Sequence, residues 1–222
     1  NITDDYKNLS YLDKSENVAT LTGYYKLFPK TSILLEYAYG DITYDNPTNS
    51  NSTYNQVRAG LKGELFNKLS GTIKFGYQER DYEDSAKKDF DGGVLYSSLI
   101  YDVSRRTQLE FNGKVGVTES SYTSNNYYDF YEFGLAAVHE LTGKWKISLD
   151  MSYGENDYPV ETTETITAKR EDEIFAQKVG LDYQLNEWVG TKLEYQHKER
   201  ASNHTAFDYK DNKIIFKIMA VF

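Results

Sequence analysis

The three histidines, His139, His197 and His204, are the residues of this 222-residue chain best suited to acid–base chemistry. A hydrolase would need one of them beside a serine or a carboxylate, at a spacing that brings both groups together. His139 falls on an apolar face beside a short turn, His197 lies on an outward face, and His204 is in a loop near Asp208. Because no spacing fixes a partner for any histidine, the sequence predicts no catalytic residue.

The sequence also contains no motif for a metal or a cofactor. The chain has no cysteine, which excludes disulfides and thiolate ligands. It has no histidine and carboxylate cluster at zinc spacing, no glycine-rich phosphate loop and no calcium-binding loop. The formal net charge of -9 is unfavourable for binding nucleic acid. We therefore expect no cofactor, no metal and no nucleic-acid partner.

The remaining candidate residues are charged side chains that recur at every second position. Residues 145–154 alternate between an apolar and a polar set, and so do 69–78, 107–116 and 177–185. In the first range the apolar set is Trp145, Ile147, Leu149, Met151 and Tyr153, and the polar set is Lys146, Ser148, Asp150, Ser152 and Gly154. A period of two is that of a β-strand, so the charges share one face of each strand.

Short turns punctuate these strands at regular intervals. The turns are expected at 29–30, 67–68, 105–106, 143–144 and 186–187. Their first residues are 38, 38, 38 and 43 positions apart. Longer polar stretches, such as 45–51 and 161–165, lie between them. Short turns at one end and long loops at the other are typical of outer-membrane barrels.

Both a soluble β-sandwich and a membrane barrel show alternating strands, but their strand lengths differ. Sandwich strands are typically about 5–6 residues long, whereas a membrane strand needs about 9–11, a length that these runs reach. The chain has no run of about 18 apolar residues that could form a transmembrane helix. It does have 21 tyrosines, a residue type that is enriched in β-strands. We expect an all-β, antiparallel up-and-down transmembrane β-barrel, in contact with the lipid of the bacterial outer membrane.

The number of strands bears on how the barrel is completed. Two strands per turn give ten, and residues 213–222 add an eleventh, whereas bacterial single-chain barrels have an even number. We expect a total of 12 or more strands, with N-terminal strands missing. Residues 1–17 would form an extracellular loop or the end of that missing region, and 18–222 a single barrel domain. A 12-strand barrel whose poor first strand lies in 1–17 is the alternative.

Several segments are similar to a known family. They are 27–37 (LFPKTSILLEY), 39–41 (YGD), 44–45 (YD), 57–63 and 71–77 (GTIKFGY). Together they resemble the outer-membrane β-barrel porins found alongside extracellular polysaccharide biosynthesis and export genes, over most of residues 1–222. The resemblance implies a passage for polysaccharide, partner proteins of polysaccharide export, and no catalytic residues. A further N-terminal part usually precedes this region in that family.

The chain ends on an aromatic residue, Phe222. A terminal aromatic resembles the signal that the barrel-assembly machinery reads, although the glycine usual within that signal is absent. The resemblance implies that this machinery inserts the chain.

The inward faces carry more basic than acidic groups, 12 against 8. Ten of these residues are the expected lining of a passage and possible solute contacts: Arg58, Lys62, Lys74, Glu110, Lys114, Lys146, Asp150, Lys178, Asp182 and Lys192. The others are Lys26, Glu36, Glu64, Arg80, Asp102, Glu140, Glu194, Lys198, Lys213 and Lys217. A basic wall favours anionic solutes. The alternative is that lysines and acids pair across strands and fill a narrow barrel.

The tyrosines allow two interpretations. Six tyrosines near strand ends fit an aromatic girdle at the headgroups: Tyr37, Tyr39, Tyr77, Tyr153, Tyr183 and Tyr195. Others could stack on sugars: Tyr24, Tyr96, Tyr122, Tyr127, Tyr128 and Tyr131.

The predicted function is a porin-like passage for polysaccharide or other anionic solutes. A non-conducting scaffold barrel in an export assembly is the alternative, and a barrel hydrolase a less favoured one.

Overall fold

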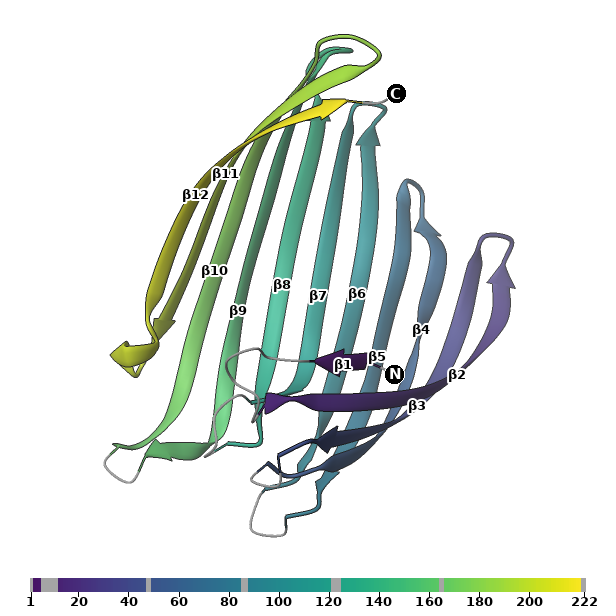
Figure 1. Ribbon diagram of the computed structural model, residues 1–222. Helices are drawn as coiled ribbons and strands as arrows, with labels where there is room; N and C mark the ends of the chain where they lie inside the picture. Colours follow the sequence, from purple (N-terminus) through teal and green to yellow (C-terminus); the bar gives the residue numbers. More distant parts are fainter. Residues whose placement is uncertain are drawn as a thin grey trace.

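A computed structural model describes residues 2–4, 12–46, 49–84, 88–120, 125–163 and 166–220, which form one antiparallel sheet (Figure 1). Its strands follow the order of the chain from β1 to β12. Their bounds are β1 Ile2–Asp4, β2 Lys14–Phe28, β3 Thr31–Tyr44, β4 Ser52–Phe66, β5 Leu69–Tyr82, β6 Phe90–Ser104, β7 Thr107–Glu119, β8 Tyr127–Glu140, β9 Trp145–Thr163, β10 Ile166–Gln184, β11 Val189–Ser202 and β12 Tyr209–Ala220.

Each long strand pairs with the next one in the chain, as a meander requires. Short turns lie at 29–30, 67–68, 105–106, 141–144 and 185–188, so all five predicted turns are confirmed. The predicted all-β, antiparallel up-and-down fold is confirmed as well. The helical element η2, Thr205–Phe207, is short. Within the described ranges no helix has the length and apolar character to cross a membrane.

Three boundaries differ from those expected. The strand β2 begins at Lys14 rather than at 18, because its register with β3 continues as far as Lys14 opposite Tyr44. The short β1 pairs with residues 14–16 of β2, so part of 1–17 is strand rather than loop. Strands β9 and β10 are 19 residues long each, and β9 runs through the stretch 161–163 that was expected to be a loop.

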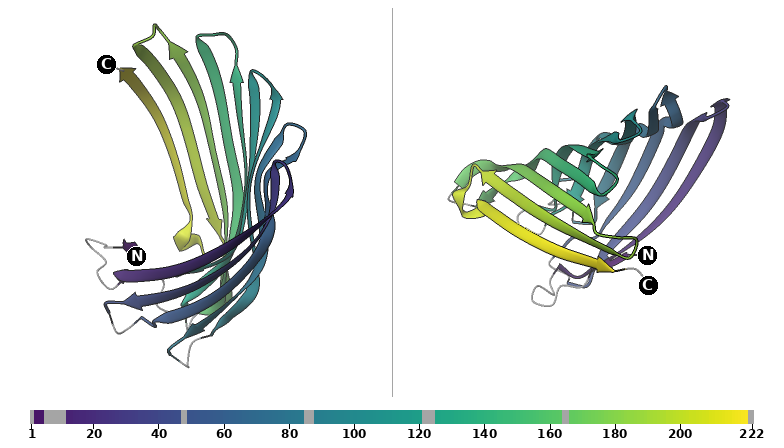
Figure 2. Two further views of the ribbon diagram at one scale, coloured as in Figure 1. Left: turned by 90° about the vertical axis from the view of Figure 1, so that its right-hand side faces the viewer. Right: turned by 90° about the horizontal axis from the view of Figure 1, so that it is seen from above.

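The sheet curves into a trough, as Figure 2 shows. Among the described residues β12 pairs only with β11 and β1 only with β2, so the sheet is not closed. The pairing register aligns side chains of one kind in rows across the strands. One row is Leu149, Val179, Tyr195 and Ile214, and the next is Asp150, Lys178, Gln196 and Lys213.

The two faces have opposite chemistry. Leu35 is 61% exposed on the convex face, whereas its neighbour Glu36 is 5% exposed on the concave face, where curvature crowds the side chains. The apolar residues expected to face lipid share the convex face: Ile73, Phe111, Trp145, Ile147, Leu149, Leu181, Ile214 and Phe216. Lys74, Glu110, Lys146, Asp150, Lys178 and Lys213 share the concave face.

A row of tyrosines ends the apolar band on the convex face. Each hydroxyl donates to a polar side chain on the next strand. Asn55, Asp91 and Asn212 lie nearer the long loops than their tyrosines, and Glu155 faces Tyr131 directly. The pairs are Tyr37 with Asn55 at 2.6 Å, Tyr77 with Asp91 at 2.7 Å, Tyr131 with Glu155 at 2.6 Å, and Tyr195 with Asn212 at 2.8 Å. A ring in apolar surroundings with a hydroxyl in polar ones fits a membrane interface. Tyr131, which the sequence grouped with sugar-stacking residues, therefore belongs to this girdle.

The face assignment predicts unequal costs at two adjacent residues. Arg in place of Leu149, in the middle of the apolar band, should lower the free energy of unfolding by about 2–4 kcal/mol, because lipid cannot solvate the guanidinium. Arg in place of Ser148, on the concave face, should be nearly neutral. Reversible denaturant unfolding in lipid vesicles measures both values, and equal costs would contradict the assignment.

Candidate functional site

All ten residues expected to line a passage lie on the concave face. They come from β4, β5, β7, β9, β10 and β11, and the register places them in successive rows rather than around one point. The candidate site is therefore an extended polar wall. Its properties depend on which charges are neutralised by neighbours and which are left for a solute.

One acid neutralises two of the predicted cations. Glu36 on β3 accepts hydrogen bonds from Arg58 on β4, with Nε at 2.7 Å, and from Lys74 Nζ on β5 at 2.7 Å. Arg58 Nη2 also contacts the same carboxylate. The hydroxyl of Thr22 on β2 lies 3.4 Å from it. The Glu36 side chain is 7% exposed, so this network is largely shielded from water. Arg58 and Lys74 are thereby held by the wall itself.

Opposite charges also lie close together at the other side of the trough. Lys192 Nζ lies 2.9 Å from Glu194 along β11, and Lys146 Nζ on β9 lies 3.7 Å from Glu140 on β8. Asp182 is opposite both Lys146 and Lys192 in the register. Opposite charges on facing positions stabilise a sheet, as the alternative interpretation expects.

Other predicted cations have no such partner. Lys62, Lys114 and Lys178 have no ion pair within 4.0 Å in the part of the chain that the structure describes. Lys62 Nζ lies 5.7 Å from the centroid of the Tyr24 ring, a cation–π contact. The acid Glu110 accepts a hydrogen bond from Asn112 at 3.1 Å. Among the ten expected lining residues, these three lysines are the cations without an ion pair in the described residues, although Glu132 faces Lys114 and Asp150 faces Lys178 in the register.

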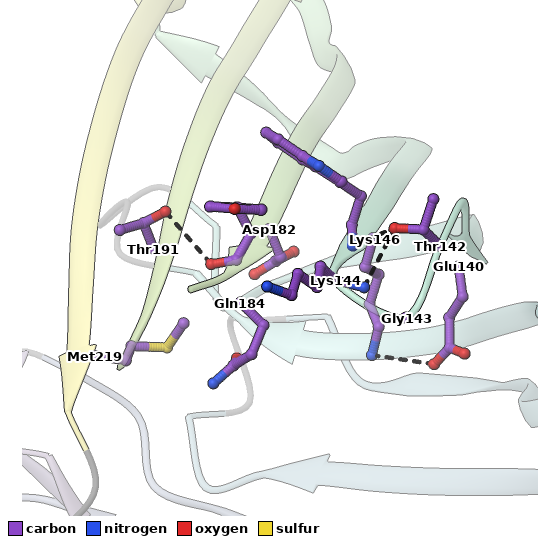
Figure 3. A pocket seen from close by; sticks show the side chains of 11 residues that line it. Glu140, Thr142, Gly143, Lys144, Lys146, Asp182, Gln184, Thr191 and Met219 are labelled. Carbon is purple, nitrogen blue, oxygen red and sulfur yellow. Dashed lines mark hydrogen bonds and ion pairs between the residues drawn. The ribbon is translucent and has the colours of Figure 1, made fainter. Parts of the chain in front are cut away.

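The concave face is hollowed near the short turns (Figure 3). The hollow, of about 320 Å³, lies between the β8–β9 turn and strands β9 to β12. Lys146 and Asp182 of the predicted set line it, together with Glu140, Gln184 and Met219. Figure 3 shows the contact between Lys146 and Glu140 at its edge. Such a mixed, polar lining suits water and small polar solutes.

Two buried ion pairs at the long-loop end were not predicted from the sequence. Arg80 Nη1 lies 2.5 Å from Glu119 Oε1. Arg170 binds Asp172 through Nε at 2.8 Å and Nη2 at 2.5 Å, and the Asp172 side chain is fully buried. Alternation would place Glu119 on the convex face with Phe111. The alternating range 177–185 begins after Arg170 and Asp172, so it did not include them. The runs of charge at 169–173 were the available signal for the second pair.

Aromatic rings cover the Arg170–Asp172 pair. The guanidinium carbon of Arg170 lies 3.6 Å from the Phe207 ring centroid and 4.5 Å from that of Tyr158. Burial raises the pKa of Tyr158 to about 12. Tyr127, expected to stack on sugars, is only 2% exposed and therefore cannot do so. Tyr128 packs against Tyr158 at 5.1 Å between ring centroids, and Tyr122 lies outside the described residues.

The histidines take structural contacts. His139 Nδ1 lies 2.9 Å from the hydroxyl of Thr107, and His197 Nδ1 lies 2.8 Å from Asn212 Oδ1. His204 is buried beside Phe207. In the described ranges no group of three or more histidine or acidic side chains is arranged to hold a metal ion.

Solved structures of similar fold are outer-membrane barrels. The outer membrane channel DcaP of Acinetobacter baumannii matches with a TM-score of 0.64 and 13% identity, over 100% of this chain and 68% of that one. The ferripyoverdine receptor of the outer membrane of Pseudomonas aeruginosa matches with a TM-score of 0.53 and 10% identity, over 95% of this chain and 36% of that one. These likenesses establish the fold.

A third match is the alcaligin outer membrane receptor FauA of Bordetella pertussis, with a TM-score of 0.52 and 13% identity. It covers 93% of this chain and 42% of that one. No curated protein matches. The family described as "Putative beta-barrel porin 2" matches residues 11–222, and the chain therefore belongs to it.

Proposed function

We propose that this chain is the wall of a water-filled passage through the bacterial outer membrane that favours anionic solutes, acidic polysaccharide among them. Membership of a porin family points to a channel rather than an enzyme. The observation that carries the anionic preference is that Lys62, Lys114 and Lys178, on the concave face, form no ion pair within 4.0 Å in the described residues. Lumen charge governs which ions and solutes pass.

The charge balance of the concave face supports this preference. The register adds Lys14, Arg170 and Arg200 to the twelve basic residues expected there, and Glu16, Glu132, Asp172 and Asp211 to the eight acidic ones. Basic groups on this face of the described strands thus exceed acidic groups by three. Glu119, which reaches the face from the end of β7, reduces the excess to two.

A scaffold function has one observation in its favour. Glu36 holds Arg58 and Lys74 in a shielded network, which fills part of the trough with paired side chains. A barrel filled in this way throughout would not conduct. Polysaccharide-export proteins would be the partners of such a scaffold, as the sequence resemblance implies, and the barrel-assembly machinery would insert either form.

The passage should prefer anions in planar bilayers. In a gradient of potassium chloride, the reversal potential of the full-length protein should have the sign of chloride selectivity. Replacing Lys62, Lys114 and Lys178 by Gln should reduce or reverse that preference, because it removes three concave-face cations that form no ion pair within 4.0 Å in the described residues. Lys210→Gln is the matched control, since Lys210 faces outward and pairs with Glu199 at 3.0 Å. An unchanged reversal potential in the triple variant would refute the assignment, and a folded protein without conductance would favour the scaffold.

Acidic oligosaccharides should interact with the passage more strongly than neutral ones. Polygalacturonate oligomers should interrupt the single-channel current at lower concentration than maltooligosaccharides of equal length, because only the former carry carboxylates for the lysines. The triple Gln variant should bring the two blocking concentrations together. If both oligomers block the unmodified protein equally, acidic polysaccharide is not a preferred solute, and only the preference for small anions stands.

A further inference from the structure

The end of the β7–β8 hairpin leaves the sheet at the long-loop end. The ladder between β6 and β7 stops at Leu95 opposite Val115, whereas the ladder between β7 and β8 continues to Glu119 opposite Tyr127. In Figure 1 the lower ends of β2 and β3 sweep across towards the lower end of this hairpin. Strands β4, β5 and β6 lie between the two groups in the sheet, so they meet across the concave face.

One carboxylate joins these elements. Glu119 Oε1 lies 2.5 Å from Arg80 Nη1 and accepts hydrogen bonds from the hydroxyls of Tyr82, at 3.2 Å, and Ser52, at 3.3 Å. Its Oε2 accepts one from the Tyr44 hydroxyl at 3.3 Å. The donors belong to β3, β4 and β5, and all four share the concave face in the register. A single residue of β7 is therefore bound by three strands.

Packing and burial fix this contact. Tyr127 stacks on Tyr82 with ring centroids 5.9 Å apart, meets Phe90 edge-on at 5.7 Å, and donates its hydroxyl to the Asp89 carbonyl at 3.0 Å. The Arg80 and Glu119 side chains are 6% and 5% exposed. Burial, and then the charge of Glu119, raises the pKa of Tyr82. A buried ion pair gains little net stability but strongly penalises the loss of one partner, so it specifies position.

We propose that the pair Arg80–Glu119, the mouth latch, determines specificity by size: it holds the long-loop mouth drawn inwards and sets the largest solute that can enter. The inference rests on the proposed passage. When the mouth latch is closed, the hairpin end lies against β3, β4 and β5 across the concave face. When it is broken, those strand ends and the hairpin are free to separate, and the entrance widens.

The state of the mouth latch can be measured without any solute. The chain contains no cysteine, so Ser52→Cys supplies a single thiol at a position that is 1% exposed. In detergent this thiol should react slowly with a charged maleimide. Adding Glu119→Gln should accelerate labelling severalfold, because it removes the charge that holds Arg80. Adding Glu199→Gln should leave the rate unchanged, since Glu199 forms an exposed ion pair with Lys210 on the convex face.

The size limit is measured by swelling of liposomes that contain the protein, in neutral sugars of increasing length. Glu119→Gln should raise the relative entry rate of the longer sugars severalfold. Tyr44→Phe removes one hydrogen bond to Glu119 and leaves the ion pair, so it should raise the entry rate of the longer sugars by a smaller factor. This variant tests the proposal if Glu119→Gln does not fold. Glu199→Gln should show the unmodified limit.

The outcomes separate the mouth latch from the passage. Faster labelling together with a larger size limit supports the proposal. An unchanged labelling rate, or faster labelling with an unchanged limit in a protein that admits small sugars, overturns it. If the unmodified protein and the variants all fold and none admits even the smallest sugar, the proposed passage itself is wrong.

Discussion

The structure depends on the need to pair every backbone N–H and C=O group where lipid offers no partner. An antiparallel ladder meets that need, and its period of two then divides each strand between lipid and interior. Leu149 and Ser148 are adjacent in sequence, but Leu149 lies on the lipid-facing side of the sheet and Ser148 on the interior side. All chemistry within the membrane is confined to the concave face. A function for this chain is therefore a property of that wall, or of the strand ends that extend beyond the apolar band.

This constraint explains how much of the fold could be predicted. Turn positions and face assignments follow from residue type and spacing alone. The turn at 67–68 and the two faces of the strand from Trp145 to Tyr153 could therefore be predicted from the sequence. The cross-strand neighbours that decide which charges pair could not be predicted. Lys74 binds Glu36 two strands away, whereas Lys114 has no ion pair in the described ranges, although both are lysines at equivalent inward positions. Only register and side-chain reach distinguish them.

Beyond the apolar band the alternation no longer determines the environment. Glu119 has the parity of Phe111 and Val115, yet it is buried against the concave face because β7 leaves β6 after Val115. Arg170 and Asp172 are buried because β9 and β10 continue past the girdle and η2 folds over them. In both places a charged residue is buried by the path of the backbone, which the local pattern does not encode.

The same division resolves the net charge of -9. Acids gather on the convex face past the tyrosine girdle, where Asp129, Asp157 and Glu171 face one another on adjacent strands. Burial and the neighbouring carboxylates raise the pKa of Asp157, because like charges on facing positions repel. The concave face carries a small positive excess instead. The net charge therefore reflects mainly the acids of the long-loop rim, whereas the proposed solute preference rests on concave-face lysines that form no ion pair in the described residues.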